Sequence, residues 1–400
     1  MNSFYVRLGN SEIEIEKRVF LALLNIPFVM AYRAYARAVE ENAISISDLK
    51  KLAEKADVPY PLFFASHKHA TQQIRRKDDF LAKKLPTKRE LMLSCRGSVS
   101  ISAIELIGRD LGRKQEFLKS KILPGATANN FVGCVAKAVK LGGSDVELAE
   151  AIRSKLRIDL GELRKLSKKK VLAYIVEKAE AAGLLVSFSS YNYMPQRIER
   201  TAQFSGLCIK DKKFPFVFIN TRDGDEEPII LESDGRQIFT LLAMLVFAAM
   251  GKFVLGNHQG KKSNQPTNKA YMIVGEILIP KKDLHAVKVA NLKDLKELSA
   301  VFKVTPSMVL RRLQVLGMNS ELVKTLRAEL RSELAAAEPP HKRSVLPLHG
   351  FEKYNGQRFS REVVRAYRME KISRDDFDNV LFRRRRATPE LVRAYVERFS

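Results

Sequence analysis

The chain has 400 residues, of which 70 are Lys or Arg and 45 are Asp or Glu, so its formal net charge is +25. Its composition, 46% hydrophobic and 29% charged with only 20 Gly and 15 Pro, excludes collagen-like, largely disordered and disulfide-stapled classes. A chain of this length is expected to form two to three domains of roughly 100–200 residues each.

The cysteines and the apolar segments bear on the compartment in which the protein works. Cys95, Cys134 and Cys208 lie far apart and lack the two-residue spacing of structural zinc sites and of thiol exchange motifs. The N-terminal residues are charged where a signal peptide needs an apolar core, so we expect a cytoplasmic protein. The apolar run 238–251 is shorter than the ~20 residues that span a bilayer, and it predicts a buried helix and no membrane segment.

The first region, residues 1–123, is predicted to be helical. Apolar residues recur at helical spacing from residue 14 to about residue 56, and a capped helix opens at Ser45. The basic stretch 75–89 is expected to be a solvated helix face, with a nucleic-acid patch as the less favoured alternative. Residues 102–121 carry apolar side chains in helical register and predict another amphipathic helix.

The second region, residues 124–338, is predicted to be an α+β core. Two helices are expected within 144–183, the second of them ending at Gly183. Three short runs rich in Phe, Val and Ile then predict strands of a small antiparallel sheet: LLVSFSSY, FSGLCIKD and FPFVFINT. The acidic run 223–227 is expected to be a solvated loop, with partner contact as its alternative, and an apolar helix begins near Gly235.

The end of the second region resembles a helix-turn-helix, and a tail follows it. Residues 270–280 predict an apolar helix or strand, and residues 292–318 have helix-turn-helix spacing with Pro306 at the first position of the second helix. A charged amphipathic helix is expected at 322–338, followed by a linker and a basic helical tail at 341–400. The candidate nucleic-acid contacts are Thr305, which is also the expected N-cap, Ser307, Arg311, Arg312, Arg383, Arg384, Arg385 and Arg386.

Several segments resemble the ImmA/IrrE family of zinc metallopeptidases in their order and spacing. They are FSGLCIKDKKFPFVFINT, RQIFTLLAMLVF, the run that ends in EILIP, and ELSAVFKVTPSMVLRRLQVLG. Upstream, ISISDLKKLAEKADVPYPLFFA and SVSISAIELIGRDLGRKQEFLK are similar to the N-terminal region of longer members, and NGQRFSREVVRAYRMEKISRDDFDNVL is similar to their C-terminal segment. The resemblance covers most of the chain and implies an α+β fold in which a metallopeptidase-like core lies between a helical N-terminal region and a helical C-terminal tail.

The zinc motif of that family is absent from this sequence. Where the family carries His-Glu-x-x-His, the chain has Ala243, Met244 and Phe247, and the resemblance places Thr267 at the acidic third ligand. Zinc needs imidazole or carboxylate ligands, and the peptidase reaction needs a glutamate that takes a proton from the metal-bound water. We therefore expect no catalytic residue, metal or cofactor here, and we expect the three helix positions to pack as ordinary core.

We expect a catalytically inactive, regulatory ImmA/IrrE-like protein of bacterial or phage origin. Family members act on, or lie next to, transcriptional regulators of mobile elements and stress responses. The resemblance thus implies a protein partner, a transcriptional regulator or a toxin-antitoxin component, that is bound without being cleaved. The alternative is a DNA-binding transcriptional regulator that uses residues 292–318 and the basic tail, and a second alternative is a hydrolase with a site rebuilt from other residues, such as His258 or His285.

Overall fold

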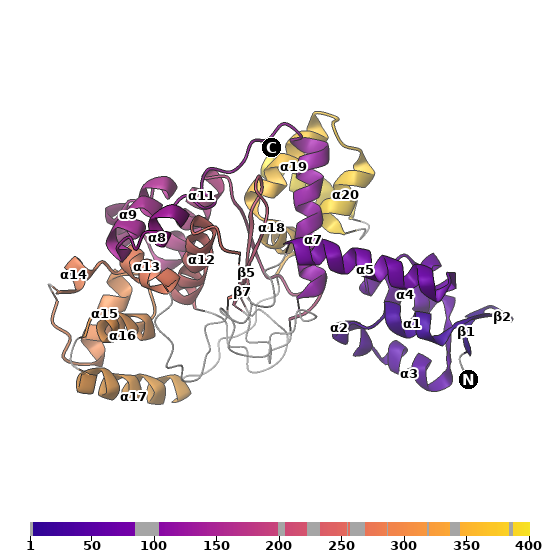
Figure 1. The fold of residues 1–400 in the computed structure, drawn as a ribbon, viewed down its shortest axis with the longest axis horizontal. Helices are drawn as coiled ribbons and strands as arrows, with labels where there is room; N and C mark the ends of the chain where they lie inside the picture. Colours follow the sequence, from indigo (N-terminus) through magenta and orange to yellow (C-terminus); the bar gives the residue numbers. More distant parts are fainter. Residues whose placement is uncertain are drawn as a thin grey trace.

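The computed structural model describes residues 3–84, 104–198, 205–221, 233–253, 255–256, 269–285, 287–317, 320–336, 345–383 and 387–400. These residues confirm the predicted α+β class, because helices predominate and the strands form two small sheets (Figure 1). One sheet lies at the N-terminal end of the molecule, and the other lies between two groups of helices. None of the helices formed by the described residues combines the length and the apolar character that a bilayer crossing requires.

The N-terminal unit contains a sheet that differs from the helical expectation for residues 1–123. Strands β1 (Ser3–Leu8) and β2 (Ser11–Glu16) form an antiparallel hairpin, and β3 (Ala43–Ser45) pairs parallel with β1. The hairpin forms because β1 alternates buried and exposed residues, and because Gly9 adopts the positive φ of +60° that its tight turn requires. The helices of this unit are α1 (Lys17–Leu23), α2 (Pro27–Met30), α3 (Arg33–Glu41), α4 (Ile46–Lys55), the 3-10 turn η1 (Tyr60–Phe64) and α5 (His67–Lys84).

Helix α7 (Glu105–Phe117) follows and continues into the π-helical turn η3 (Leu118–Ile122), which confirms the helix predicted at 102–121. Its apolar face packs on the second sheet and on the C-terminal helices. Gln115 on the same face is fully buried, and its side-chain amide donates a hydrogen bond of 2.8 Å to the carbonyl oxygen of Phe214. α7 therefore connects the N-terminal unit to the rest of the fold (Figure 1).

The second sheet contains the three strands expected between residues 184 and 221. They are β4 (Leu185–Phe188), β5 (Gly206–Ile209) and β6 (Phe216–Ile219), and together with β7 (Leu255–Gly256) they have the order β4-β6-β5-β7. β5 is antiparallel to β6, as expected, and it also pairs antiparallel with β7, a strand that was not predicted. β4 is parallel to β6, so the antiparallel prediction is wrong for β4. A short turn joins β5 to β6, so these two strands must be antiparallel. The connection from β4 to β5 is longer and allows β4 to run in either direction.

This sheet separates two hydrophobic clusters, because its side chains alternate between its faces. One face packs against α12 and its neighbours through Val186, Cys208, Val217 and Ile219. The opposite face packs against α7 and the C-terminal helices through Leu185, Leu207, Ile209, Phe216 and Phe218. The N-terminal unit has a third cluster of its own, in which the Phe20 ring stacks 4.1 Å from that of Phe4.

The helices on the first face account for most predicted elements of residues 124–338. Both helices expected within 144–183 are present, and Gly183 follows the second of them with φ of +92°. The segment that was expected to be helix or strand is helix α13, and three short helices, α8, α10 and α14, were not predicted. These helices are α8 (Ala136–Lys140), α9 (Asp145–Leu156), α10 (Leu160–Lys165), α11 (Lys168–Ala181), α12 (Asp234–Ala249), α13 (Lys269–Leu278), α14 (Lys281–His285), α15 (Leu292–Val301), α16 (Pro306–Val315) and α17 (Ser320–Ala336).

The C-terminal residues are helical, as expected, and they cover the opposite face of the second sheet beside α7. Their core is aromatic: Tyr354 lies edge-on to Phe218 of β6, with ring centroids 6.4 Å apart. The division of the chain at residues 123, 338 and 341 stays a prediction. The helices are α18 (Pro347–Asn355), α19 (Gln357–Arg368), α20 (Arg374–Phe382) and α21 (Pro389–Phe399).

Candidate functional site

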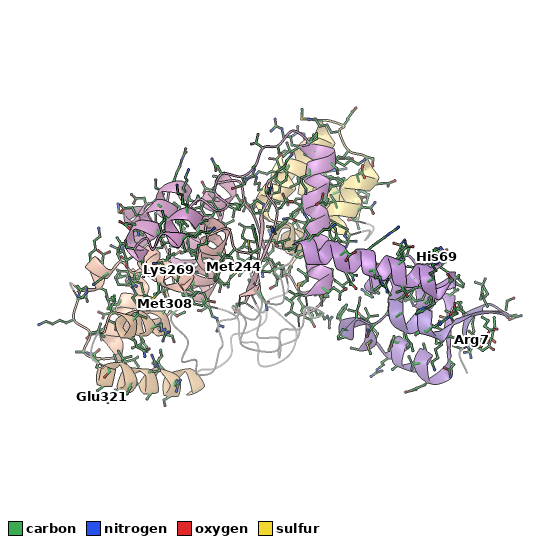
Figure 2. The ribbon with its side chains drawn as sticks, viewed as in Figure 1. Arg7, His69, Met244, Lys269, Met308 and Glu321 are labelled. Atoms are coloured by element: carbon green, nitrogen blue, oxygen red, sulfur yellow. The ribbon has the colours of Figure 1, made fainter. Side chains whose placement is uncertain are left out.

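The positions that the family resemblance aligns with the zinc motif lie in the middle of α12, where Figure 2 labels Met244. Ala243, Met244 and Phe247 have 0%, 0% and 3% of their surface exposed, and all three belong to the hydrophobic cluster on the first face of the sheet. The Phe247 ring also packs edge-on against Tyr271 of α13, with centroids 6.1 Å apart. The three positions pack as ordinary core, as expected.

These residues do not fit a zinc ion. Alanine and phenylalanine offer no ligand atom, and the thioether of methionine is a soft donor that suits Cu(I) better than zinc. Thr267 and His258 lie outside the described residues, and His285 is exposed at the end of α14. Within the described residues, no group of three or more His, Cys, Asp or Glu side chains is placed to hold a metal ion.

A buried ion pair lies beside α12 instead. Arg312 of α16 pairs with Glu276 of α13, and the two side chains are only 4% and 7% exposed. Arg312 also donates a hydrogen bond of 3.1 Å to the carbonyl oxygen of Ile279, while the Glu276 carboxylate accepts one of 3.1 Å from the backbone N–H of Lys281. Arg312, a candidate nucleic-acid contact, is thus enclosed and holds α16 against α13, which leaves it unavailable to a duplex.

The other candidates in the helix-turn-helix-like segment have different environments. Thr305 is the N-cap of α16, as predicted, and its hydroxyl accepts a hydrogen bond of 3.3 Å from the Met308 N–H. Ser307 and Arg311 are exposed, and Arg311 donates to the side chain of Gln314 over 3.3 Å. The apolar residues of α15 and α16 belong to the core cluster on the first face of the sheet. The segment is therefore packed into the fold, with two of the four predicted side chains on its surface.

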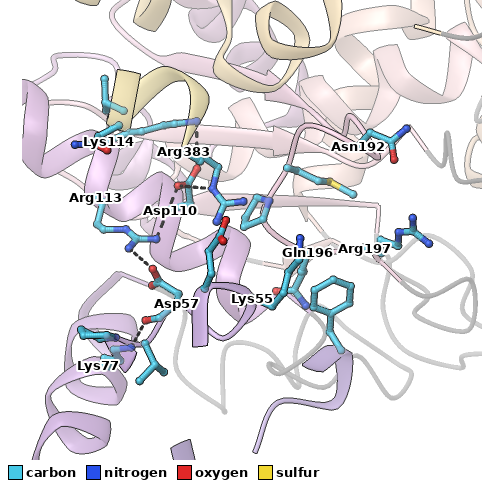
Figure 3. A pocket seen from close by; sticks show the side chains of 18 of the residues that line it. Lys55, Asp57, Lys77, Asp110, Arg113, Lys114, Asn192, Gln196, Arg197 and Arg383 are labelled. Atoms are coloured by element: carbon cyan, nitrogen blue, oxygen red, sulfur yellow. Dashed lines mark hydrogen bonds and ion pairs between the residues drawn. The ribbon is translucent and has the colours of Figure 1, made fainter. Parts of the chain in front are cut away.

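Of the four arginines predicted in the tail, Arg383 is described, and Arg384, Arg385 and Arg386 lie outside the described residues. Arg383 ends α20 in the left-handed conformation, with φ of 55°. Its side chain points inward, and its Nε lies 3.4 Å from Oδ1 of Asp110 on α7 (Figure 3). The interaction places Arg383 in a polar pocket that the sequence did not predict.

This pocket, here called the junction pocket, has a volume of about 580 Å³ and lies where four parts of the chain meet. The N-terminal unit, α7, the segment 191–197 and α20 each contribute to its walls (Figure 3). Its charged lining residues are Lys55, Lys77, Arg113, Lys114, Arg197, Arg383, Glu54, Asp57, Asp110 and Asp376. Cations outnumber carboxylates in this lining.

Asp110 is the centre of the charge cluster. Its carboxylate lies 3.2 Å from Lys114, 3.4 Å from Arg383 and 3.8 Å from Arg113, and it accepts a hydrogen bond of 2.8 Å from the hydroxyl of Tyr354. Burial acts to raise the pKa of Asp110, but the three cations and this hydrogen bond outweigh burial and hold the pKa well below its usual range. Asp110 is therefore ionised at neutral pH.

Lys114 is the most enclosed cation of the pocket, with 1% of its side chain exposed. Its ammonium group donates a hydrogen bond of 2.7 Å to Asn355 and lies 4.0 Å from the centre of the Tyr354 ring. Burial lowers the pKa of Lys114 to about 8, against the opposing effect of Asp110. The ammonium group keeps its charge at neutral pH because these partners replace water.

Asp57 links the pocket to the N-terminal unit. Its carboxylate accepts a hydrogen bond of 2.7 Å from Arg113, and its backbone carbonyl accepts one from Lys77. Asp57 adopts a left-handed conformation with φ of 56°, which Asp and Asn tolerate better than most residues. Burial lowers the pKa of Lys77 to about 8. Half of the Arg113 side chain, 49%, stays exposed on the open side of the pocket.

Sequence reasoning missed this pocket because its residues come from four separated segments. One signal was present: Lys114 stands on the apolar face of α7, in the series Ile107, Leu111, Lys114 and Leu118. A lysine on a buried helix face needs a partner, and Asp110 lies one turn before it. That pattern predicts the buried pair of Lys114 and Asp110, but it does not predict the cavity.

Comparisons of this chain with protein-family models, curated proteins and solved structures give no significant match. The resemblance to the ImmA/IrrE family thus stays a prediction that rests on the motifs quoted above.

Proposed function

We propose that the chain is a catalytically inactive ImmA/IrrE-like regulatory protein of the cytoplasm that binds a protein partner without cleaving it. The observation that carries this proposal is the complete enclosure of Ala243, Met244 and Phe247 in the hydrophobic core. A peptidase site needs polar ligands that reach solvent, and here the corresponding positions have neither ligand atoms nor access to water.

The partner is a transcriptional regulator or a toxin-antitoxin component. This choice follows from the family resemblance, and loss of the metal ligands is compatible with it because recognition surfaces lie on loops and flanking helices. The net charge of +25 favours an acidic partner surface, since complementary charge speeds association.

Coexpression tests this proposal directly. The tagged full-length chain would be produced together with each transcriptional regulator or toxin-antitoxin protein whose gene neighbours its own, and the purified complexes would be measured by size-exclusion chromatography and by intact mass. We expect a complex that contains the full-length regulator, with or without a metal chelator during lysis. Regulator fragments that disappear when the chelator is present would contradict the proposal, and so would the absence of any complex.

Direct DNA binding is the second candidate, because Ser307 and Arg311 are exposed on the second helix of a helix-turn-helix-like pair. Burial of Arg312 in the ion pair with Glu276 weighs against it. A mobility-shift assay with heparin competition separates the two functions. Retarded DNA that survives heparin and is lost in Arg311→Met would favour the DNA-binding alternative.

A further inference from the structure

The junction pocket has the dimensions and the chemistry of a binding site for a small molecule. Its volume of about 580 Å³ lies within the range of roughly 300–1,000 Å³ that ligand pockets occupy. It lies away from α12, on the side of the second sheet that α7 and the C-terminal helices cover. A ligand there would touch the N-terminal unit, α7 and α20 together (Figure 3).

The lining of the pocket carries a net positive charge, which favours the binding of an anion. Six cationic side chains and four carboxylates line it, and three of the cations converge on the single carboxylate of Asp110. Arg113 also pairs with Asp57, so two carboxylates face these three cations, and the lining as a whole carries two more cations than carboxylates in a partly desolvated site. The Arg113 side chain is 49% exposed and Arg197 is exposed, and the two lie on opposite sides of the pocket (Figure 3). A guanidinium group matches the oxygens of a phosphate in a two-pronged geometry.

Aromatic side chains form another part of the wall. Phe28 and Tyr32 of the N-terminal unit lie edge to face, with ring centroids 5.5 Å apart. Phe117 of α7 also lines the pocket, and the Arg197 guanidinium lies 4.2 Å from the centre of the Tyr191 ring. Aromatic and guanidinium planes of this kind stack on a flat ring such as a nucleobase.

We propose that the junction pocket binds a nucleoside monophosphate, with its phosphate held by Arg113 and its base held against the aromatic wall beside Arg197 (Figure 3). Nucleotide binding in this pocket does not require the chain to bind a protein partner, so it can fail separately from the proposed function. It needs no movement of the core, because its walls are already in place.

Substitution of Asp57 and substitution of the pocket arginines are expected to change nucleotide affinity in opposite directions. Its carboxylate pairs with Arg113 at 2.7 Å and competes with a bound phosphate for that guanidinium. Asp57→Asn removes the competing charge and keeps a residue that tolerates the left-handed backbone, so it is expected to tighten phosphate binding several-fold. Arg113→Met removes the phosphate contact and Arg197→Met removes the guanidinium that stacks beside the aromatic wall, and each is expected to weaken nucleotide binding by about tenfold.

The experiment is isothermal titration calorimetry of the full-length protein with AMP, GMP, CMP and UMP, and separately with their nucleosides and with inorganic phosphate. Arg398→Met is the matched control, because Arg398 is an exposed, ion-paired arginine that does not line the pocket. Thermal melts of each variant show whether it is folded. We expect saturable binding of one molecule per chain for at least one nucleotide, with weaker binding of its nucleoside and of phosphate.

Three results would overturn the proposal. The first is the absence of binding by all four nucleotides. The second is binding of inorganic phosphate as tight as that of the nucleotides, which would indicate an adventitious anion only. The third is nucleotide binding that Arg113→Met, Arg197→Met and Asp57→Asn leave unchanged or shift in the same direction while the variants stay folded.

Discussion

The centre of α12 and the junction pocket lie on opposite sides of the same four-stranded sheet, and their chemistry is opposite as well. Ala243, Met244 and Phe247 on α12 are enclosed and have no charge. Asp110 and Lys114 on α7 are equally enclosed, but they are ionised and paired. The family resemblance points to the first place, whereas the buried polar groups, which are the more informative observation, point to the second.

The difference has a physical reason. Polar metal ligands are costly to bury in a largely apolar setting unless a metal binds them. Ala243, Met244 and Phe247 avoid that cost, so α12 packs as hydrophobic core. The charges near α7 remain because each buried cation there has a carboxylate, an amide or an aromatic ring as its partner. In this chain, the buried charges beside α7 therefore indicate a functional site better than the motif positions on α12 do.

The largest expected effect concerns the enclosed hydrophobic core at the centre of α12. Met244→Glu places a carboxylate at a fully buried position among apolar side chains. We expect a loss of about 4 kcal/mol or more in the free energy of unfolding, measured by urea denaturation.

Met369→Glu is the matched control for that experiment, because Met369 is 54% exposed at the end of α19. We expect it to change stability by no more than about 0.5 kcal/mol. If Met244→Glu were tolerated as well as Met369→Glu, the centre of α12 would have access to water, and the closed-core account would fail.

The second effect concerns two adjacent arginines on α16. Arg312→Met leaves the Glu276 carboxylate buried without its cation and is expected to cost about 3–5 kcal/mol. Arg311→Met, next to it on the exposed surface, is expected to cost less than about 0.5 kcal/mol. Chemical denaturation of both variants and of the double variant Glu276→Leu, Arg312→Leu measures these costs. A double variant less stable than Arg312→Met would contradict the burial of an unpaired charge as the cause.

The third and smallest effect concerns Asp211, at the turn between β5 and β6 on the α7 side of the sheet. It pairs with Lys119 at 2.8 Å and Lys84 at 3.1 Å, and these cations and two backbone N–H groups lower its pKa to about 2 although burial acts to raise it. A carboxyl group with a lowered pKa stabilises the folded state above its unfolded pKa, near 3.8. Its contribution is lost as the pH falls through about 2.

Asp211→Asn should therefore lower the free energy of unfolding by about 2 kcal/mol at neutral pH, and the difference from wild type should shrink toward zero as the pH approaches 2. Urea denaturation of both proteins at a series of pH values measures it. A difference that stays constant across the acid range would show that the carboxylate acts by packing and not by charge.

Local signals in the sequence predicted much of the fold. Short runs rich in Phe, Val and Ile located the strands β4, β5 and β6, and an uncharged apolar run located the helix α12. The cap at Thr305 located the start of α16. The hairpin of β1 and β2 was missed because its charged residues hide a two-residue alternation. The direction of β4 was missed because pairing between strands distant in sequence leaves no local pattern.

The sites were less predictable than the elements. Burial at 243, 244 and 247 followed from helical spacing, but the different environments of Arg311 and Arg312 depend on how α16 packs against α13. The junction pocket depends on contacts between residues more than 200 positions apart, such as Asp110 and Arg383. No spacing rule along one chain reports such a contact.

Zinc content distinguishes a closed hydrophobic core at the centre of α12 from a metal site there. The purified full-length protein would be incubated with excess zinc, desalted, and analysed for metal and protein in the same sample. We expect zinc at the level of the buffer, because Ala243, Met244 and Phe247 on α12 offer no zinc ligand and are closed to water. One zinc retained per chain would mean that other residues have rebuilt a metal site, and it would contradict the account.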